Sequence, residues 1–311
     1  MHFIDPAVSA AGLFVGLVVG LTGMGGGALM TPLLVLFFNV QPLAAVSSDL
    51  VASLFMKPVA GGVHWRRGTV NKSLVKWLVM GSIPTAFAGV FMLTSFGHGE
   101  STQSAVKFAL GIALLLVAAG IVARPALTRF RSPDNKNSVR PFSVRPIPTL
   151  LVGVVGGLVV GMTSVGSGSL VIVLLLLLYP RIRLSDLVGT DLVQAIPLVA
   201  SASLGHLLFG DFQFGLTSSI LVGAIPGAYV GARLSSRAPD HWIRPALVVV
   251  LLASGLKLVG ASNLVLGCTV PVMILLSVWH ATATTRALAS AAVQALGTGA
   301  GPQSDATGNA E

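Results

Sequence analysis

The chain repeats a glycine-rich motif inside two segments that are too apolar for a water-soluble protein. The stretch Gly20–Leu29, GLTGMGGGAL, aligns with Gly161–Leu170, GMTSVGSGSL. After a shift of one residue, Ser48-Asp49 aligns with Thr190-Asp191, and a Gly-x-Ile-Pro stretch at 81–84 aligns with one at 223–226. Two related halves, each with a glycine break inside a long apolar run, are typical of membrane folds built by duplication around interrupted helices.

The composition places these segments in a lipid bilayer. Hydrophobic residues make up 54% of the chain and charged residues 9%, and the mean hydropathy is +0.88. Apolar runs of about 20 residues cross roughly 30 Å of hydrocarbon as helices. The backbone must satisfy its own hydrogen bonds in lipid, and the runs do not alternate as barrel strands do. We therefore expect an all-α polytopic membrane protein.

The apolar pattern also predicts the domain organisation. Nine apolar segments lie near residues 7–38, 43–64, 73–95, 105–123, 147–179, 185–209, 215–234, 243–260 and 264–281. We expect a first transmembrane repeat over 1–123 and a second over 147–260. A basic cytoplasmic linker at 124–146 joins them, because this stretch is rich in Arg and Pro and cannot form a core. An extra C-terminal span is expected over 261–285 and a disordered tail over 286–311.

Loop charge predicts how the two repeats are oriented. Segments 7–38 and 147–179 would each run about 50 Å as one helix. Their glycine clusters favour a break, as a tilted helix with a broken waist or as a re-entrant hairpin. Loop 65–76 carries four Lys or Arg residues, whereas the matched loop 210–214 carries none. The positive-inside rule places these loops on opposite sides of the membrane.

The sequence therefore predicts two inverted repeats, each with a broken or re-entrant Gly-rich helix plus three spans, followed by a final C-terminal span. The N-terminus would lie outside and the C-terminus in the cytoplasm. The alternative is a parallel arrangement of nine spans, which would place Arg181 and Arg183 outside.

A broken helix offers backbone N–H groups and a helix dipole to an anion. The first break would donate from Gly25, Gly26 and Gly27, and the second from Gly166, Ser167, Gly168 and Ser169. The cavity would be lined by the nearby hydroxyl and amide side chains of Thr22, Ser48, Thr163, Ser164, Thr190 and Gln194. The alternative use of such small residues is close helix packing.

Three charged residues are candidates for coupling transport to a proton or a cation. Asp49 and Asp191 are the acids that repeat in register, and an acid inside a membrane is energetically expensive. The alternative role for both is helix capping. Lys57 lies well inside an apolar segment, where it could pair with a carboxylate, meet an anionic substrate or snorkel toward the headgroups.

Several other functions lack their sequence signals. The chain has no phosphate-binding G-x-x-x-x-G-K-[ST] motif, no G-x-S-x-G and no H-E-x-x-H, and it has one cysteine, Cys268. We expect no enzyme activity, no catalytic residues, no metal and no cofactor. The sequence has no basic stripe with interleaved aromatic residues, so we expect no nucleic-acid partner. The expected partners are a small anion and the lipid bilayer, and a homo-oligomer is compatible with the sequence.

The glycine motif of residues 20–27, with Pro32 and then Ser47-Ser48-Asp49, is repeated after about 140 residues. This pattern resembles the sulfite exporter TauE/SafE family, bacterial inner-membrane permeases that are also called probable membrane transporter proteins. The resemblance covers roughly residues 8–260. The two halves differ at one point of the motif: the second half reads Gly-Ser-Gly-Ser where the first reads Gly-Gly-Gly-Ala. The two breaks therefore need not be equivalent.

The resemblance implies a multi-pass protein of the bacterial inner membrane. It implies secondary transport of a small sulfur oxyanion such as sulfite, a sulfonate or sulfoacetate, with alternating access between the two repeats. The alternatives are an anion channel, or a transporter of another small carboxylate or anion.

Overall fold

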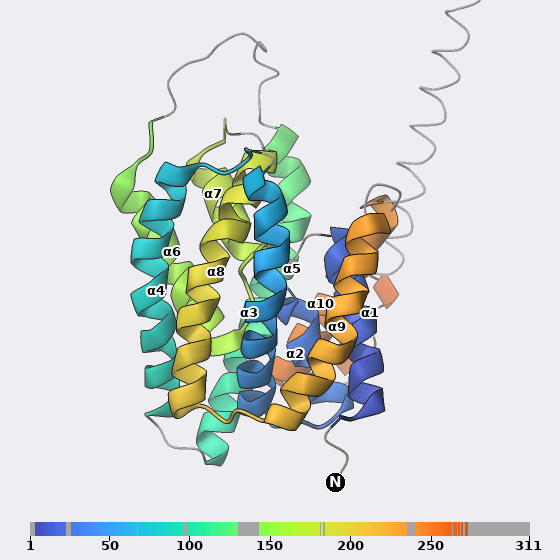
Figure 1. Ribbon diagram of the computed structural model, residues 1–311. Helices are drawn as coiled ribbons and strands as arrows, with labels where there is room; N and C mark the ends of the chain where they lie inside the picture. Colours follow the sequence, from blue (N-terminus) through green and yellow to red (C-terminus); the bar gives the residue numbers. More distant parts are fainter. Residues whose placement is uncertain are drawn as a thin grey trace, which may run out of the picture.

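The computed structural model describes residues 4–22, 26–66, 68–95, 99–129, 143–180, 182, 184–234 and 240–262, with residues 264, 265, 267, 269, 271 and 272. Within these residues the chain forms α-helices and no strand (Figure 1). The helices are α1 (Pro6–Thr22), α2 (Gly27–Phe37), α3 (Pro42–Arg66), α4 (Lys72–Thr94), α5 (Glu100–Arg129), α6 (Pro146–Thr163), α7 (Leu170–Leu178), α8 (Leu184–Phe209), α9 (Phe214–Leu234) and α10 (Asp240–Val259).

Five of the described helices are long and apolar enough to cross a membrane. They cover Lys72–Thr94, Glu100–Ala123, Pro146–Thr163, Ser185–Phe209 and Phe214–Gly231. The all-helical class and the multi-pass character expected from the sequence are confirmed. Helix α5 continues to Arg129, into the segment expected to be the linker. Most of the expected C-terminal span and all of the expected tail lie outside the described residues.

Helices α3 and α8 run antiparallel through the middle of the bundle (Figure 1). At one end, the amide of Asn71, just after α3, donates to Thr190 near the start of α8 over 3.0 Å. At the other end, a Cβ placed on Gly210, just after α8, would lie 2.7 Å from the hydroxyl of Ser47 near the start of α3. The two sequence-related helices therefore have opposite directions.

Each glycine-interrupted segment folds as a hairpin of two helices. The backbone N–H of Arg145, before α6, donates to the Tyr179 hydroxyl just after α7 over 2.8 Å. Helix α1 likewise begins beside α9, where the Asp5 amide donates to Ser219, and four residues separate the end of α2 from the start of α3. The chain thus enters and leaves each hairpin at the same end of the bundle.

The most extensive helix contacts join α1 to α9 and α4 to α6. Small residues allow the backbones to touch along both pairs. A Cβ on Gly223 of α9 would lie 1.8 Å from the carbonyl oxygen of Ser9. A Cβ on Gly157 of α6 would lie 2.4 Å from the carbonyl oxygen of Ser82. Each long helix of a broken segment is therefore held by a helix of the other repeat.

We predict that Gly223→Ala strongly destabilises the protein, whereas Gly62→Ala does not. The added methyl group at Gly223 would overlap the α1 backbone and cost about 1–3 kcal/mol or more. A Cβ on Gly62 of α3 has no atom within 4 Å, and alanine favours a helix over glycine by roughly 1 kcal/mol. Thermal unfolding in detergent measures the stability of both variants. Equal melting temperatures for the two variants would contradict the close approach of α1 and α9.

Candidate functional site

The two helix breaks contact each other in the interior of the bundle. A Cβ on Gly27, the first residue of α2, would lie 2.0 Å from the carbonyl oxygen of Ser164, which follows α6. Gly166 and Gly168, in the second break, have φ values of +117° and +100°, a region that side chains rarely allow. The glycines of the first break permit the contact, and those of the second shape the turn.

Asp49 of α3 is bound at the meeting point of the breaks. Its side chain is 1% exposed. One carboxylate oxygen, Oδ2, accepts hydrogen bonds from Ser164 Oγ over 2.7 Å and from Thr31 Oγ1 of α2 over 3.0 Å. Asp49 lies seven residues after Pro42, where α3 begins, so the helix-capping interpretation is wrong. The carboxylate instead links three helices.

Ser164 holds its hydroxyl toward Asp49 from an unusual backbone conformation. Its φ is +60°, in the left-handed region, and it ends α6 with its N–H bonded to the carbonyl oxygen of Val160. Glycine is the usual residue at such a position, because a side chain costs about 1–2 kcal/mol there. The hydrogen bond to a buried carboxylate offsets this strain.

Lys57 of α3 reaches the second break. Its side chain is 8% exposed, and its ammonium group donates a hydrogen bond to Ser167 Oγ. The snorkelling interpretation is therefore wrong. Asp49 and Asp191 are the other buried Asp or Lys side chains among the described residues, and the pairing of Lys57 with a carboxylate considered from the sequence stays a prediction.

Asp191 of α8 is fully buried at 0% exposure. Gln194, one helical turn later, donates to its Oδ1 over 2.9 Å and accepts a longer contact of 3.4 Å from Ser82 of α4. Asp191 also lies seven residues into its helix, so capping is excluded here too. The side-chain amide of Gln194, which the sequence predicted to line the substrate cavity, instead donates to the carboxylate of Asp191.

His206 joins the end of α8 to both neighbouring elements. Its Nδ1 lies 2.8 Å from Ser47 Oγ of α3, and its Nε2 lies 2.8 Å from the carbonyl oxygen of Gly161 in the last turn of α6. The histidine of the second half thus lies beside the Ser-Asp motif of the first half. Spacing along one helix gives no sign of this contact between the halves.

The remaining predicted residues have local roles in the structure. Thr22 donates to Val18 and Thr163 to Val159, each in its own helix. Ser169 donates its amide to Gly166. The Ser48 hydroxyl is buried and has no hydrogen-bond partner among the described residues. Gly26 is buried at the start of α2, and Gly25 lies outside the described residues.

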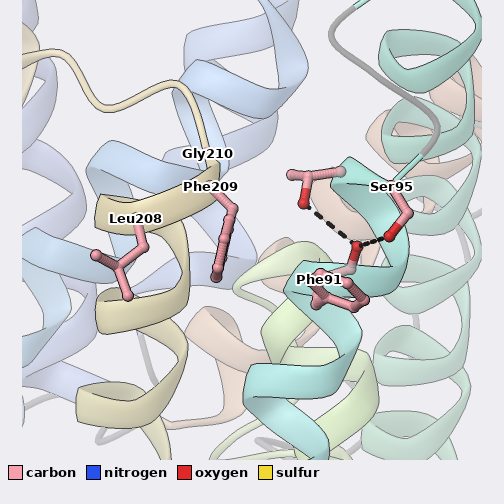
Figure 2. A pocket seen from close by; sticks show the side chains of 6 residues that line it. Phe91, Ser95, Leu208, Phe209 and Gly210 are labelled. Carbon is pink, nitrogen blue, oxygen red and sulfur yellow. Dashed lines mark hydrogen bonds between the residues drawn. The ribbon is translucent and has the colours of Figure 1, made fainter.

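A pocket of about 320 Å³ opens between the last turns of α4 and α8. Figure 2 shows Phe91 and Ser95 facing Phe209 across it. The ring of Phe209 packs edge-to-face on Phe91, with centroids 5.8 Å apart. Gly210 lines the pocket, and a Cβ there would lie 2.8 Å from His206 Nδ1. The pocket therefore adjoins His206 of α8 and its partner Ser47. Ser47 lies two residues before Asp49 on α3.

An all-helical, multi-pass membrane protein with broken helices and buried charges has the features of a membrane transporter. The sequence profile of the family described as "Sulfite exporter TauE/SafE" matches residues 8–258. The chain belongs to this family. It is a transmembrane transporter of the TauE/SafE type.

Curated relatives agree over nearly their whole length. The chain is 40% identical to the probable membrane transporter protein YjnA of Bacillus subtilis (strain 168), over 80% of this chain and 97% of the relative. It is 26% identical to YdhB of the same organism, another probable membrane transporter protein, over 78% and 95%. These relatives are named as transporters, not enzymes. No solved structure matches the chain significantly.

We predict that Gly27→Ala destabilises the protein far more than Gly26→Ala. The methyl group at Gly27 would overlap the backbone of Ser164, which cannot move without disturbing the second break. At Gly26 the methyl group would meet the flexible end of Met56, at 3.1 Å. Melting temperatures in detergent test this pair, and a well-folded Gly27→Ala protein would show that the breaks do not touch.

We also predict that Ser164→Ala is less stable than Ser164→Gly. Both variants lose the hydrogen bond to Asp49, worth about 1.5–3 kcal/mol for a charged acceptor. Only alanine keeps a side chain in the left-handed conformation, at a further cost of about 1–2 kcal/mol. Equilibrium unfolding of both proteins measures the difference. A Ser164→Ala protein more stable than the Ser164→Gly protein would show that the backbone at residue 164 is not in the left-handed conformation.

Proposed function

We propose that this protein is a secondary transporter of a small sulfur oxyanion, such as sulfite, a sulfonate or sulfoacetate, in the bacterial inner membrane. The observation that carries the proposal is the meeting of two broken helical hairpins in the interior of the bundle, beside buried polar side chains. The N-terminus of α2, at the first break, supplies N–H groups to an anion. Ser48, Ser167 and Lys57 add side-chain donors.

The geometry supports alternating access between two inverted repeats. Helices α3 and α8 align in sequence and run in opposite directions. The pairing of α1 with α9 matches that of α6 with α4 when the two repeats are exchanged. Such a pseudo-two-fold arrangement lets one protein adopt two conformations that open to opposite sides.

The distribution of charge supports an orientation. Arg66, Lys72 and Arg145 lie at the end of the bundle where α3 ends and α6 begins. Asp5 and Glu100 lie at the opposite end, near the pocket beside Gly210. The positive-inside rule then puts the basic end in the cytoplasm and the N-terminus and pocket outside. The pocket would be the external access to the central site.

Uptake into proteoliposomes tests the proposed transport. We expect radiolabelled sulfite or taurine to enter with saturable kinetics and to show counterflow. Gly26→Leu should abolish uptake, because the leucine side chain would occupy the space at the start of α2 where we propose that the anion binds. Gly62→Leu, at an open position of α3, is the control, and gel filtration checks that both proteins fold. Uptake that never saturates would favour a channel, and full uptake by Gly26→Leu would contradict the proposed site.

Cysteine labelling tests the inverted arrangement. In a Cys268→Ser background, Val70→Cys and Phe212→Cys place one thiol in each of two matched loops. We expect a membrane-impermeant maleimide to label them from opposite sides of the membrane. Labelling from the same side would rule out inversion and leave the parallel arrangement.

A further inference from the structure

The loop that follows α3 closes one end of the bundle against α8. The backbone N–H of Asn71 donates to the hydroxyl oxygen of Thr190 over 3.0 Å. A Cβ placed on Gly189 would lie 2.6 Å from the hydroxyl oxygen of Thr69, so the loop and the helix are in direct contact. Thr190 is fully buried. A loop of the first half, residues 68–71, thus covers the start of a helix of the second half.

The sequence repeat places a matching loop at the opposite end of the bundle (Figure 1). Residues 210–213 follow α8 as residues 68–71 follow α3. In the alignment that matches Ser48 with Thr190, Asn71 matches Gln213. The equivalent contact would therefore be a hydrogen bond from the backbone N–H of Gln213 to the hydroxyl oxygen of Ser48.

This second contact is not formed in the structure. Ser48 is fully buried, and its hydroxyl has no hydrogen-bond partner among the described residues. Gln213 is exposed, whereas Asn71 is half-buried. The pocket beside Gly210 lies at this same end of the bundle. One loop is therefore closed onto its helix, and the matched loop leaves Ser48 without the donor that Thr190 has.

A buried hydroxyl without a partner is unfavourable, and native structures rarely keep one. Closing of the loop after α8 onto the start of α3 would supply a donor to Ser48. An exchange of conformation between the two halves would at the same time release Thr190 from the loop after α3. Each conformation then satisfies one of the two matched hydroxyls. Each hydroxyl directly precedes a buried aspartate, Asp49 or Asp191, so both contacts lie next to the interior of the bundle.

We propose that the loops after α3 and α8 are the two gates of the transport path, with Thr190 and Ser48 as their latches. The bond from Asn71 to Thr190 closes one end in the conformation seen here. A bond from Gln213 to Ser48 closes the pocket end in the alternative conformation, in which the first bond is broken. This inference rests on the proposed transport function and names the contacts that alternate.

Double electron–electron resonance measures both gates in detergent, without added oxyanion and in a Cys268→Ser background. Spin labels on Val70→Cys and Ser185→Cys span the gate after α3, and labels on Gln41→Cys and Phe212→Cys span the gate after α8. None of these four side chains is buried. The distance distribution of each pair gives the ratio of its open to its closed conformation.

Loss of each latch should shift this equilibrium in opposite directions. Thr190→Val, which keeps the shape of the side chain, should favour the conformation with the α3 gate open and the α8 gate closed by about fivefold, as expected for loss of one hydrogen bond. Ser48→Ala should disfavour that conformation about fivefold, and the double variant should return to the wild-type ratio.

Two variants are matched controls for the loss of a latch. Thr190→Ser keeps the hydroxyl, and Ser203→Ala removes a buried hydroxyl of α8 that is not a latch. Both should keep the wild-type distances at both gates. Gel filtration checks the folding of every variant.

The outcomes separate this inference from the transport function. Shifts of Thr190→Val and Ser48→Ala in the same direction, or no shift in a folded Thr190→Val protein, would overturn the gates. Uptake of sulfite or taurine by such a protein would leave the transport function standing. Opposite shifts in a protein that takes up neither compound would support the gates and contradict the proposed substrate alone.

Discussion

The structure depends on the contact between two chain breaks inside an apolar bundle. A backbone that leaves the helical conformation in a membrane must find hydrogen-bond partners within the protein. Here the residue that ends α6, Ser164, lies against Gly27 and binds Asp49, and the amides that open α7 bond to the carbonyl oxygen of Gly166. The second break is therefore supported by two residues of the first half, Gly27 and Asp49.

Close helix packing keeps the breaks in register. Glycines on α1, α6 and α9 bring backbones into contact along the pairs α1–α9 and α4–α6. These contacts join the first helix of each broken segment to the opposite repeat. Since interhelical attraction in lipid comes from packing and not from burial of apolar surface, such pairs act as rigid units.

Sequence periodicity and glycine repeats predicted the helical class, the position of both breaks and the buried acids. The breaks were predictable because glycine clusters inside apolar runs have few other uses. Several contacts of the site were not predictable, because they join residues more than 100 positions apart. Ser164 with Asp49, Lys57 with Ser167 and His206 with Ser47 all connect the two halves. Spacing along one helix cannot detect such pairs, and it misplaced Asp49 and Asp191 at helix starts. Thr31 was missed because a threonine in an apolar helix commonly bonds to its own backbone.

The differences between the halves carry more functional information than their similarities. Equivalent halves would contain matched charges, and the buried core would then be symmetric about its centre. Lys57 has no counterpart at Val199, and the hydroxyl-rich second break differs from the glycine-only first break. Two buried carboxylates repeat between the halves and the buried lysine does not, so the buried charges are not symmetric. The repeat therefore accounts for the fold, and its departures give the two breaks different charges and hydrogen-bonding groups.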